Sequence, residues 1–469
     1  MQVGRISYKG LNPGRDLALA IITVASTLTA VWVGVSYSWT PVGVAVGALA
    51  LGLVCARSTQ FLIFVTAMVL MLNQTVIFGG SDVLSLGRWM VLLLFCAIFA
   101  LQFFSREHIR EPRLLDAIAL FFLLYTLAST TYSIAPDVTL QRGLSICLMY
   151  VAIFWGIWGY ADRASAEKIV QALIYAVGLI LLMGLVAAPF WPGAWQRTGR
   201  FQGLFTNPNA IGLLAAIILP LVVWKVFQSR WWPNIMLLGV VALSLVLSAS
   251  RNGFFVSLIA IVYLFSKARG SKVLLAGGTL LALLFLVVAV EAVDVGSVVE
   301  DYAVGRLVNP LEVGDASGRF QLWPVAISLI ETQVMTGHGF GTEEFALVDI
   351  GRTLRDFSGG YFHNSYLGMA FQLGIVGLVL LIAPLIVLVA TQFWRSRHDY
   401  TISLSHALQA VLLAGLLTAF FESWIYSVGN AYSFPFWVCV MLLARDANRE
   451  KSQQAPVTSR QKAVGSRQK

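Results

Sequence analysis

The chain has 469 residues, of which 58% are hydrophobic and only 12% are charged, and its formal net charge is +9. Soluble domains carry about 25% charged residues, so this composition excludes a protein whose whole surface faces water. The basic residues are scattered over short loops and a tail, a distribution typical of membrane orientation and not of nucleic-acid binding. Apolar runs near the ~20 residues needed to cross a bilayer predict an all-α polytopic integral membrane protein.

The runs predict 12–14 transmembrane helices, and the short run 41–56 would form a re-entrant pair with the first span if the lower count holds. In chain order the predicted spans are 17–37, 41–56, 61–78, 84–104, 114–133, 140–160, 168–190, 209–228, 232–250, 252–267, 273–293, 364–392, 403–423 and 430–445.

One long polar segment interrupts this pattern. The predicted regions are a cytoplasmic N-terminus (1–16), transmembrane helices (17–293), a long external loop with short amphipathic helices (294–363), C-terminal transmembrane helices (364–445) and a disordered cytoplasmic tail (446–469). A loop of roughly 70 residues without a hydrophobic span is unusual and calls for a functional explanation.

Charge asymmetry orients the chain, because Lys and Arg concentrate in cytoplasmic loops. With the N-terminus inside, the inside loops and the tail are basic, as the rule requires. Several arginines depart from the rule and suggest an anionic ligand on the external face. Those on the external side are Arg197, Arg200, Arg251, Arg306, Arg319, Arg352 and Arg355, while Arg88 and Arg142 lie inside or at the external ends of apolar runs.

Two of these arginines stand in short polar connections. Arg200 precedes Asn209 in a segment that mixes turn formers with polar groups just before a span, and this segment is either an ordinary loop or part of a binding surface. Arg251 lies at a tight reversal between two spans, where a charged side chain must reach water, a headgroup or a bound anion.

The long loop contains its own candidates. Arg319 opens a predicted amphipathic helix with Phe320, Trp323, Ile327 and Ile330 at helical spacing, and backbone donors at a helix start favour anions. The glycines around His338, in Gly337–Gly341, suit a tight turn and are weak evidence for phosphate binding.

His363 stands directly before a long span, with Asn364 or Ser365 able to cap that helix. The positive end of the helix dipole disfavours imidazolium, which favours a neutral, base-competent histidine. His338 competes for this role, and a purely structural histidine is the alternative for either position.

One base, several arginines and a membrane fit the transfer of a sugar from a lipid pyrophosphate. Arginine forks stabilise the charge of the leaving pyrophosphate, and a positioned base activates the acceptor hydroxyl. A direct displacement of this kind would invert the anomeric carbon and need neither a metal nor another cofactor.

The ordered motifs resemble the O-antigen ligase and polymerase superfamily over roughly residues 80 to 440. They are Arg200-Phe201-Gln202-Gly203 with Asn207-Pro208-Asn209, Ser250-Arg251, Ser317-Gly318-Arg319 with Trp323, the segment Gly337–Gly341, and His363-Asn364-Ser365-Tyr366-Leu367 followed by Gly374.

The resemblance implies a fold related to the GT-C glycosyltransferases, in a bacterial inner membrane, with the active site and the long loop on the periplasmic side. It implies a glycan donor on undecaprenyl pyrophosphate, with Arg251 and Arg319 recognising the pyrophosphate and His363 activating the acceptor. Besides this set, we expect substrate contacts from the following side chains: Arg88, Arg142, Arg200, Asn209, His338, Asn364 and Tyr366.

Ligases and polymerases differ in the acceptor of the glycan. A ligase passes the glycan to lipid A–core oligosaccharide, whereas a polymerase passes it to a growing glycan, and the segment Tyr132–Asp137 looks like exopolysaccharide polymerases. Superfamily naming favours the ligase. A lipid or glycan transporter is a more distant alternative, because ion-coupled carriers place ionisable groups near mid-membrane, whereas Asp116, Asp294 and Glu422 lie near the ends of predicted spans. A non-catalytic assembly scaffold is a further alternative.

Overall fold

The computed structural model describes residues 59–78, 82–104, 110–163, 165–229, 232–267, 319–351 and 361–454. Within these ranges the secondary structure is helical, with two isolated β-bridges and no strand. Five of the described helices are long and apolar enough to cross a membrane, and several shorter apolar helices accompany them. The predicted class, an all-α polytopic membrane protein, is therefore confirmed.

The helices follow the predicted spans closely in the described ranges. Up to residue 267 they are α3 (Thr59–Leu72), α4 (Asp82–Phe104), α5 (Leu114–Ala128), α6 (Pro136–Val151), α7 (Trp158–Arg163), α8 (Ala166–Ala187), α9 (Pro208–Gln228), α10 (Trp232–Leu247) and α11 (Arg251–Ser266). From residue 319 they are α14 (Arg319–Thr332), α15 (Glu343–Gly351), α16 (Ser365–Arg395), α17 (Leu404–Thr418) and α18 (Ser433–Gln454).

Two predicted spans extend well beyond the observed helices, and three cannot be compared. The run 61–78 stops being helical at Leu72 and the run 403–423 at Thr418, whereas the run 140–160 lies within one continuous helical stretch formed by α6, a π-helical turn and α7. The predicted spans 17–37, 41–56 and 273–293 lie outside the described residues.

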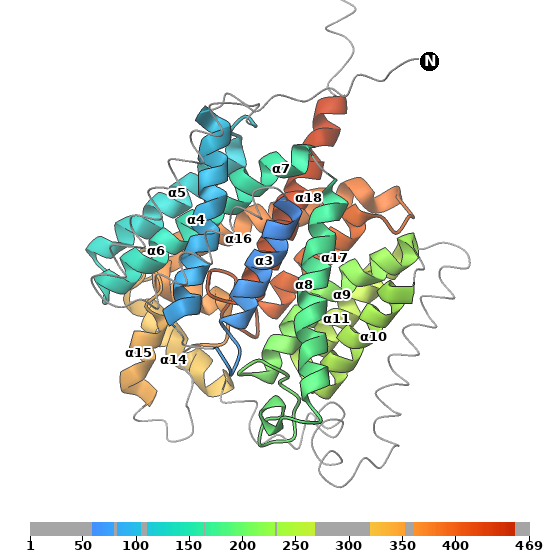
Figure 1. The fold of residues 1–469 in the computed structure, drawn as a ribbon. Coiled ribbons are helices and arrows are strands. Elements are labelled where there is room, and N and C mark those ends of the chain that lie inside the picture. Colours follow the sequence, from blue (N-terminus) through green and yellow to red (C-terminus); the bar gives the residue numbers. More distant parts are fainter. Residues whose placement is uncertain are drawn as a thin grey trace, which may run out of the picture.

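Helix α9 is the most buried of the five candidate membrane spans. It packs against α8, α10, α11 and α17, and nearly every residue from Ala210 to Trp224 is buried (Figure 1). Its apolar residues do not form a single stripe, which is the pattern of a helix surrounded on all sides. The approach of α11 is closest where Gly212 faces Gly253, because no side chain separates the two backbones.

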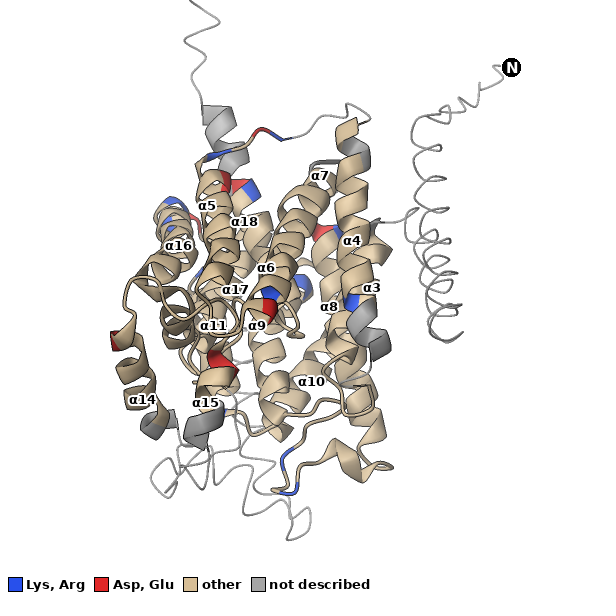
Figure 2. Cartoon of the chain, turned by 90° about the vertical axis from the view of Figure 1, so that its left-hand side faces the viewer, with Lys and Arg blue, Asp and Glu red and all other residues tan. Residues whose placement is uncertain are grey.

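The two ends of the bundle are formed by different segments. Helices α14 and α15 and the α8–α9 connection lie at one end, which we call the loop end (Figure 1). At the opposite end, the basic end, Lys267 Nζ donates to the Ser396 carbonyl at 2.9 Å, and Arg395 closes α16. The helical surface between the ends carries few charges (Figure 2).

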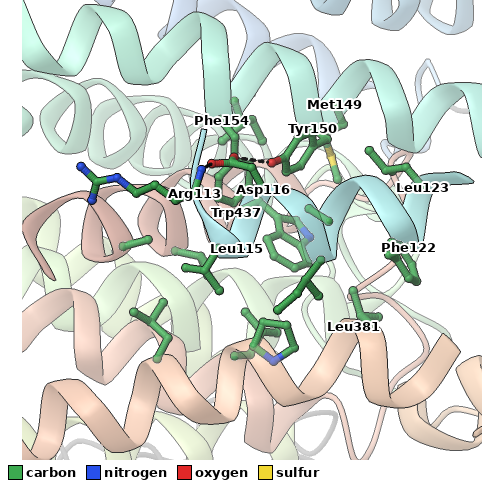
Figure 3. A pocket seen from close by; sticks show the side chains of 18 of the residues that line it. Arg113, Leu115, Asp116, Phe122, Leu123, Met149, Tyr150, Phe154, Leu381 and Trp437 are labelled. Carbon is green, nitrogen blue, oxygen red and sulfur yellow. Dashed lines mark hydrogen bonds between the residues drawn. The ribbon is translucent and has the colours of Figure 1, made fainter. Parts of the chain in front are cut away.

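The π-helical turn Ala152–Ile157 is stabilised by Arg110. A π-turn breaks the regular hydrogen-bond ladder, and Arg110 Nε donates to the Phe154 carbonyl at 2.9 Å. Asp116 forms an ion pair with Arg110 at 2.5 Å and accepts from the Tyr150 hydroxyl at 2.7 Å. These contacts close one side of a small apolar pocket of about 130 Å³ between α5, α6, α16 and α18 (Figure 3).

Helix α16 is broken at Leu373 and Gly374, which have non-helical backbone angles. The glycine turn Gly337–Gly341 fills the break: His338 N–H donates to the Phe371 carbonyl and Gly339 N–H to the Gln372 carbonyl, both at 2.9 Å. Backbone groups freed within an apolar bundle need such partners. The turn requires glycine because Gly337, Gly339 and Gly341 have φ of +68°, +105° and +79°.

The contact between α9 and α11 leads to a stability prediction. In Gly253→Ala the new Cβ would lie 2.4 Å from Gly212 Cα, so the helices must separate. We expect a loss of about 1–3 kcal/mol, as for other overpacked cores, measured by thermal unfolding in detergent. The matched control is Gly239→Ala in α10, whose Cβ meets nothing within 4 Å. Equal melting temperatures for the two variants would show that the helices do not approach this closely.

Candidate active site

A polar cavity of about 570 Å³ lies at the loop end, between segments that are far apart in sequence. Its walls come from α4, α6, the start of α9, the long loop and the α17–α18 connection. Polar or ionisable side chains provide much of the lining: Gln74, Arg88, Gln141, Arg142, Asn209, Glu343, Tyr361, His363, Gln372, Glu422, Ser423, Tyr426 and Asn430. Four of the predicted site residues, Arg88, Arg142, Asn209 and His363, therefore meet here.

His363 occupies an unusual backbone position. Its φ is +52°, in the left-handed region that residues other than glycine rarely adopt. Such a conformation costs of order 1–3 kcal/mol and persists only where the surroundings hold it. On one side the Phe362 N–H donates to Glu343 Oε1, and on the other the Asn364 N–H donates to Ser423 Oγ at 3.2 Å. The left-handed backbone of His363 is thus held on both sides, because the N–H groups of Phe362 and Asn364 are bonded to side chains of other segments.

Asn364 is the cap of α16. Its side-chain oxygen accepts from the N–H groups of Tyr366 and Leu367, at 2.9 and 3.1 Å. The Tyr366 hydroxyl donates to the Leu416 carbonyl, and its ring lies against Phe420. Neither residue lines the cavity, so the structure places both beside His363 as parts of its support.

A carboxylate from the α17–α18 connection meets the His363 ring. Glu422 Oε2 lies 2.9 Å from His363 Nδ1, and Glu422 Oε1 accepts from Asn209 Nδ2 at 3.1 Å. Asn209 Oδ1 in turn accepts from Arg200 at 2.8 Å, and Arg200 Nε donates to the Ser248 carbonyl at 3.0 Å. Arg200 is therefore connected to His363 through two intervening side chains.

Two arginines bring positive charge to the cavity. Arg142 forms an ion pair with Glu344 at 2.5 Å and also donates to the Gly341 carbonyl. The half-buried Arg88 packs against Gly429 and is close enough to Arg142 for the two charges to repel. Among the described residues Arg88 has no carboxylate and no hydrogen-bond acceptor of its own. An anion in the cavity would relieve this repulsion.

Glu343 joins the long loop to the rest of the site. It is 1% exposed and accepts from Ser423 (2.9 Å), Tyr426 (2.6 Å), Gln372 (3.4 Å) and the Phe362 N–H. Burial raises the pKa of the Glu343 carboxyl, while these donors and the nearby His363 oppose the rise. A carboxylate with this many partners is a structural clamp.

Next to the clamp, Tyr361 lines the cavity and donates to Glu344 Oε2 at 3.1 Å. Burial, with the charge of Glu344, raises the pKa of the Tyr361 phenol to about 12. The phenol is therefore neutral at physiological pH and acts as a hydrogen-bond donor.

The remaining predicted residues lie outside the cavity lining. His338 stacks on Phe371 with ring centroids 4.4 Å apart, and its two nitrogens meet the Phe371 carbonyl and the Thr332 hydroxyl. Arg251 is the first residue of α11, and Arg319 is the first residue of α14. Helix α14 reaches the site through Trp323, whose indole N–H donates to the Phe362 carbonyl at 3.2 Å.

Sequence reasoning did not place Glu422, Glu343 and Tyr361 in the site. The pair Glu422–Ser423 at the end of an apolar run was the available signal, because a charged group there must have a partner. In the described ranges no three His, Cys, Asp or Glu side chains gather as they would around a metal ion.

The comparisons with known proteins agree with the resemblance seen in the motifs. A family model described as O-antigen ligase matches residues 235–382, about a third of the chain. The matched region contains Arg251, Arg319 and His363, and it supports placing the chain in the O-antigen ligase and polymerase superfamily. The chain matches no curated protein.

The clamp at Glu343 yields a second stability prediction. Glu343→Gln keeps the side-chain volume but turns an amide NH₂ toward groups that donate, including Gln372 Nε2. A buried donor left without an acceptor costs about 1–3 kcal/mol, so the melting temperature in detergent should fall. Glu331→Gln on the exposed face of α14 is the control and should melt like the unchanged protein. If Glu343→Gln also melts unchanged, the clamp is not holding the loop.

Proposed function

We propose that this protein is an O-antigen ligase-type glycosyltransferase. It moves a glycan from undecaprenyl pyrophosphate to lipid A–core oligosaccharide at the periplasmic face of the bacterial inner membrane. The observation that carries this proposal is the shared cavity, in which a carboxylate-bonded histidine faces the same space as two arginines. The match to the O-antigen ligase model supports the same class of reaction.

The arginines supply the donor site. Arg88 and Arg142 present two positive charges to the cavity, and guanidinium forks match phosphate oxygens in geometry. A pyrophosphate leaving group gains charge as its bond to the sugar breaks, so fixed positive charges favour the transition state. Arg251 and Arg319 are the further pyrophosphate contacts that the motifs imply, each at the first residue of its helix.

His363 is the acceptor base. The acceptor hydroxyl transfers its proton to the imidazole as its oxygen forms a bond to the anomeric carbon. The bond from that carbon to the pyrophosphate oxygen breaks, and the electron pair leaves with the pyrophosphate. Glu422 Oε2, 2.9 Å from Nδ1, stabilises the imidazolium that forms. This displacement inverts the anomeric carbon and uses no metal.

A polymerase would use the same donor and the same residues with a different acceptor. The segment that resembles polymerases, Tyr132–Asp137, packs on the glycine turn: Ile134 N–H donates to the His338 carbonyl at 3.0 Å. An in vitro reaction decides between the two. Purified protein receives lipid-linked glycan together with either lipid A–core or a second lipid-linked repeat unit. Product with lipid A–core supports the ligase, and product only with the repeat unit replaces it by the polymerase.

The base is tested by His363→Asn, because asparagine adopts left-handed backbone more readily than alanine does. Loss of a positioned base typically lowers turnover by about 10²–10⁴-fold, and glycan transfer should fall accordingly. His398→Asn is the control: it makes the same substitution at an exposed position at the basic end, outside the cavity lining, and should keep the activity. Near-normal turnover in His363→Asn at unchanged expression would rule out this base.

The donor site is tested by Arg88→Lys. Lysine keeps the charge but not the planar fork, so we expect the KM for the lipid-linked donor to rise by roughly tenfold, about 1.4 kcal/mol. Arg197→Lys, in the exposed α8–α9 connection at the same end, is the matched control. Donor kinetics that are identical in the two variants would remove Arg88 from the pyrophosphate site.

A further inference from the structure

Four side chains from three separate segments form one continuous polar chain that ends at the proposed base. Arg200 donates to Asn209, Asn209 donates to Glu422, and Glu422 contacts His363 Nδ1. We infer that this chain sets the tautomer of His363, with the proton on Nδ1 and the lone pair on Nε2. Arg200 and Asn209 are then positioning residues, and not contacts for the substrate. The catalytic meaning of this inference rests on the proposed function.

The donor–acceptor order of these hydrogen bonds follows from the chemistry of arginine. A guanidinium only donates hydrogen bonds, so the side-chain atom of Asn209 that meets Arg200 must be the oxygen. The NH₂ of Asn209 then points to Glu422 Oε1, 3.1 Å away. An amide orientation is normally assigned from its partners, and here a partner with only one role removes the ambiguity.

Glu422 determines which nitrogen of the His363 imidazole carries the proton. An ionised carboxylate only accepts, so Oε1 accepts from Asn209 and Oε2 accepts from His363 Nδ1, 2.9 Å away. A neutral histidine has a single N–H, which must therefore be at Nδ1. The lone pair needed to receive the acceptor's proton is then at Nε2.

The surroundings hold this arrangement in place. The side chains of His363 and Glu422 are 25% and 12% exposed, and the backbone of His363 is held in its left-handed conformation from both sides. Arg200 is likewise anchored by its second bond, to the Ser248 carbonyl. The chain therefore connects two anchored backbone segments, the Ser248 turn and the segment before α16.

The same logic predicts what the variant Glu422→Gln does. Asn209 still donates, so the side-chain oxygen of the introduced glutamine must face Asn209, and the glutamine NH₂ must face His363 Nδ1. Nδ1 then accepts, and the single proton of the neutral ring moves to Nε2, where it blocks proton uptake. This one isosteric change thus inverts the tautomer while the hydrogen-bond chain stays intact.

The kinetic test compares Glu422→Gln with Glu422→Asp. A carboxylate-to-amide change behind a catalytic histidine lowers turnover by about 10⁴-fold in serine proteases, and we expect kcat to fall by about 10³–10⁴-fold with the donor KM unchanged. Glu422→Asp keeps the charge and should recover part of this loss. Glu167→Gln, an exposed hydrogen-bonded carboxylate at the basic end, is the control and should leave kcat unchanged.

A double variant separates positioning from an independent role. If Glu422 acts only through the imidazole, adding Glu422→Gln to His363→Asn should lower kcat no further. A further drop in the double variant, or full kcat in Glu422→Gln, would overturn the inference.

Nitrogen NMR reads the tautomer directly and does not depend on glycan transfer. Protein labelled with ¹⁵N-histidine contains five histidines, and the His363 signals are those missing from His363→Asn. At a pH where the ring is neutral we expect protonated Nδ1 in the unchanged protein and protonated Nε2 in Glu422→Gln. Protonated Nε2 in the unchanged protein contradicts the inference. The expected tautomers in a protein that transfers no glycan would leave the inference standing and reject the proposed function.

Discussion

The break in α16 is the constraint on which the site depends. Within an apolar bundle the carbonyls of Phe371 and Gln372 need donors, and the glycine turn supplies them. The turn then carries Gly341 to Arg142, whose guanidinium donates to the Gly341 carbonyl. The same turn is followed by Glu343, the clamp that holds Phe362. A broken apolar helix and the loop before it thus form one wall of the cavity.

The three glutamates in and around the cavity have different kinds of partner. Glu343 is fully buried and satisfied by neutral donors, whereas Glu422 contacts an ionisable ring and Glu344 contacts Arg142. Arg88 is the cation without a matching acid among the described residues. Arg88 therefore keeps a positive charge beside Arg142 that no described carboxylate offsets, and under the proposed function this is where an anionic leaving group would gain charge.

The cap next to His363 could be predicted from the sequence, but the backbone conformation of His363 could not. A histidine followed by Asn364 and an apolar run predicts a capped helix start, and the structure has that cap. The left-handed backbone at His363 has no sequence signature, because it depends on anchors at Glu343 and Ser423. In α14 the predicted stripe was less accurate: Leu322 and Ala326 are buried, whereas Ile327 is exposed.

The positions of the glycine turn and of Glu422 could not be predicted either, because they too depend on residues far away in the sequence. Glycines at positive φ are predictable as a turn, but that the turn fills a break in α16 depends on residues more than 30 positions away. Glu422 belongs to an apolar run that reads as membrane span to residue 423, while the helix ends at Thr418. The end of that helix is what frees Glu422 to reach His363.

The sequence by itself determined the membrane class and most span positions, because the length and apolar character of a run are local properties of composition. Only the tertiary structure decided which polar residues meet. Arg88, Arg142, Asn209 and His363 come from segments separated by up to 275 positions, yet they line one cavity. A hydrogen bond needs its two atoms within about 3 Å, and no spacing along the chain encodes such a distance between helices.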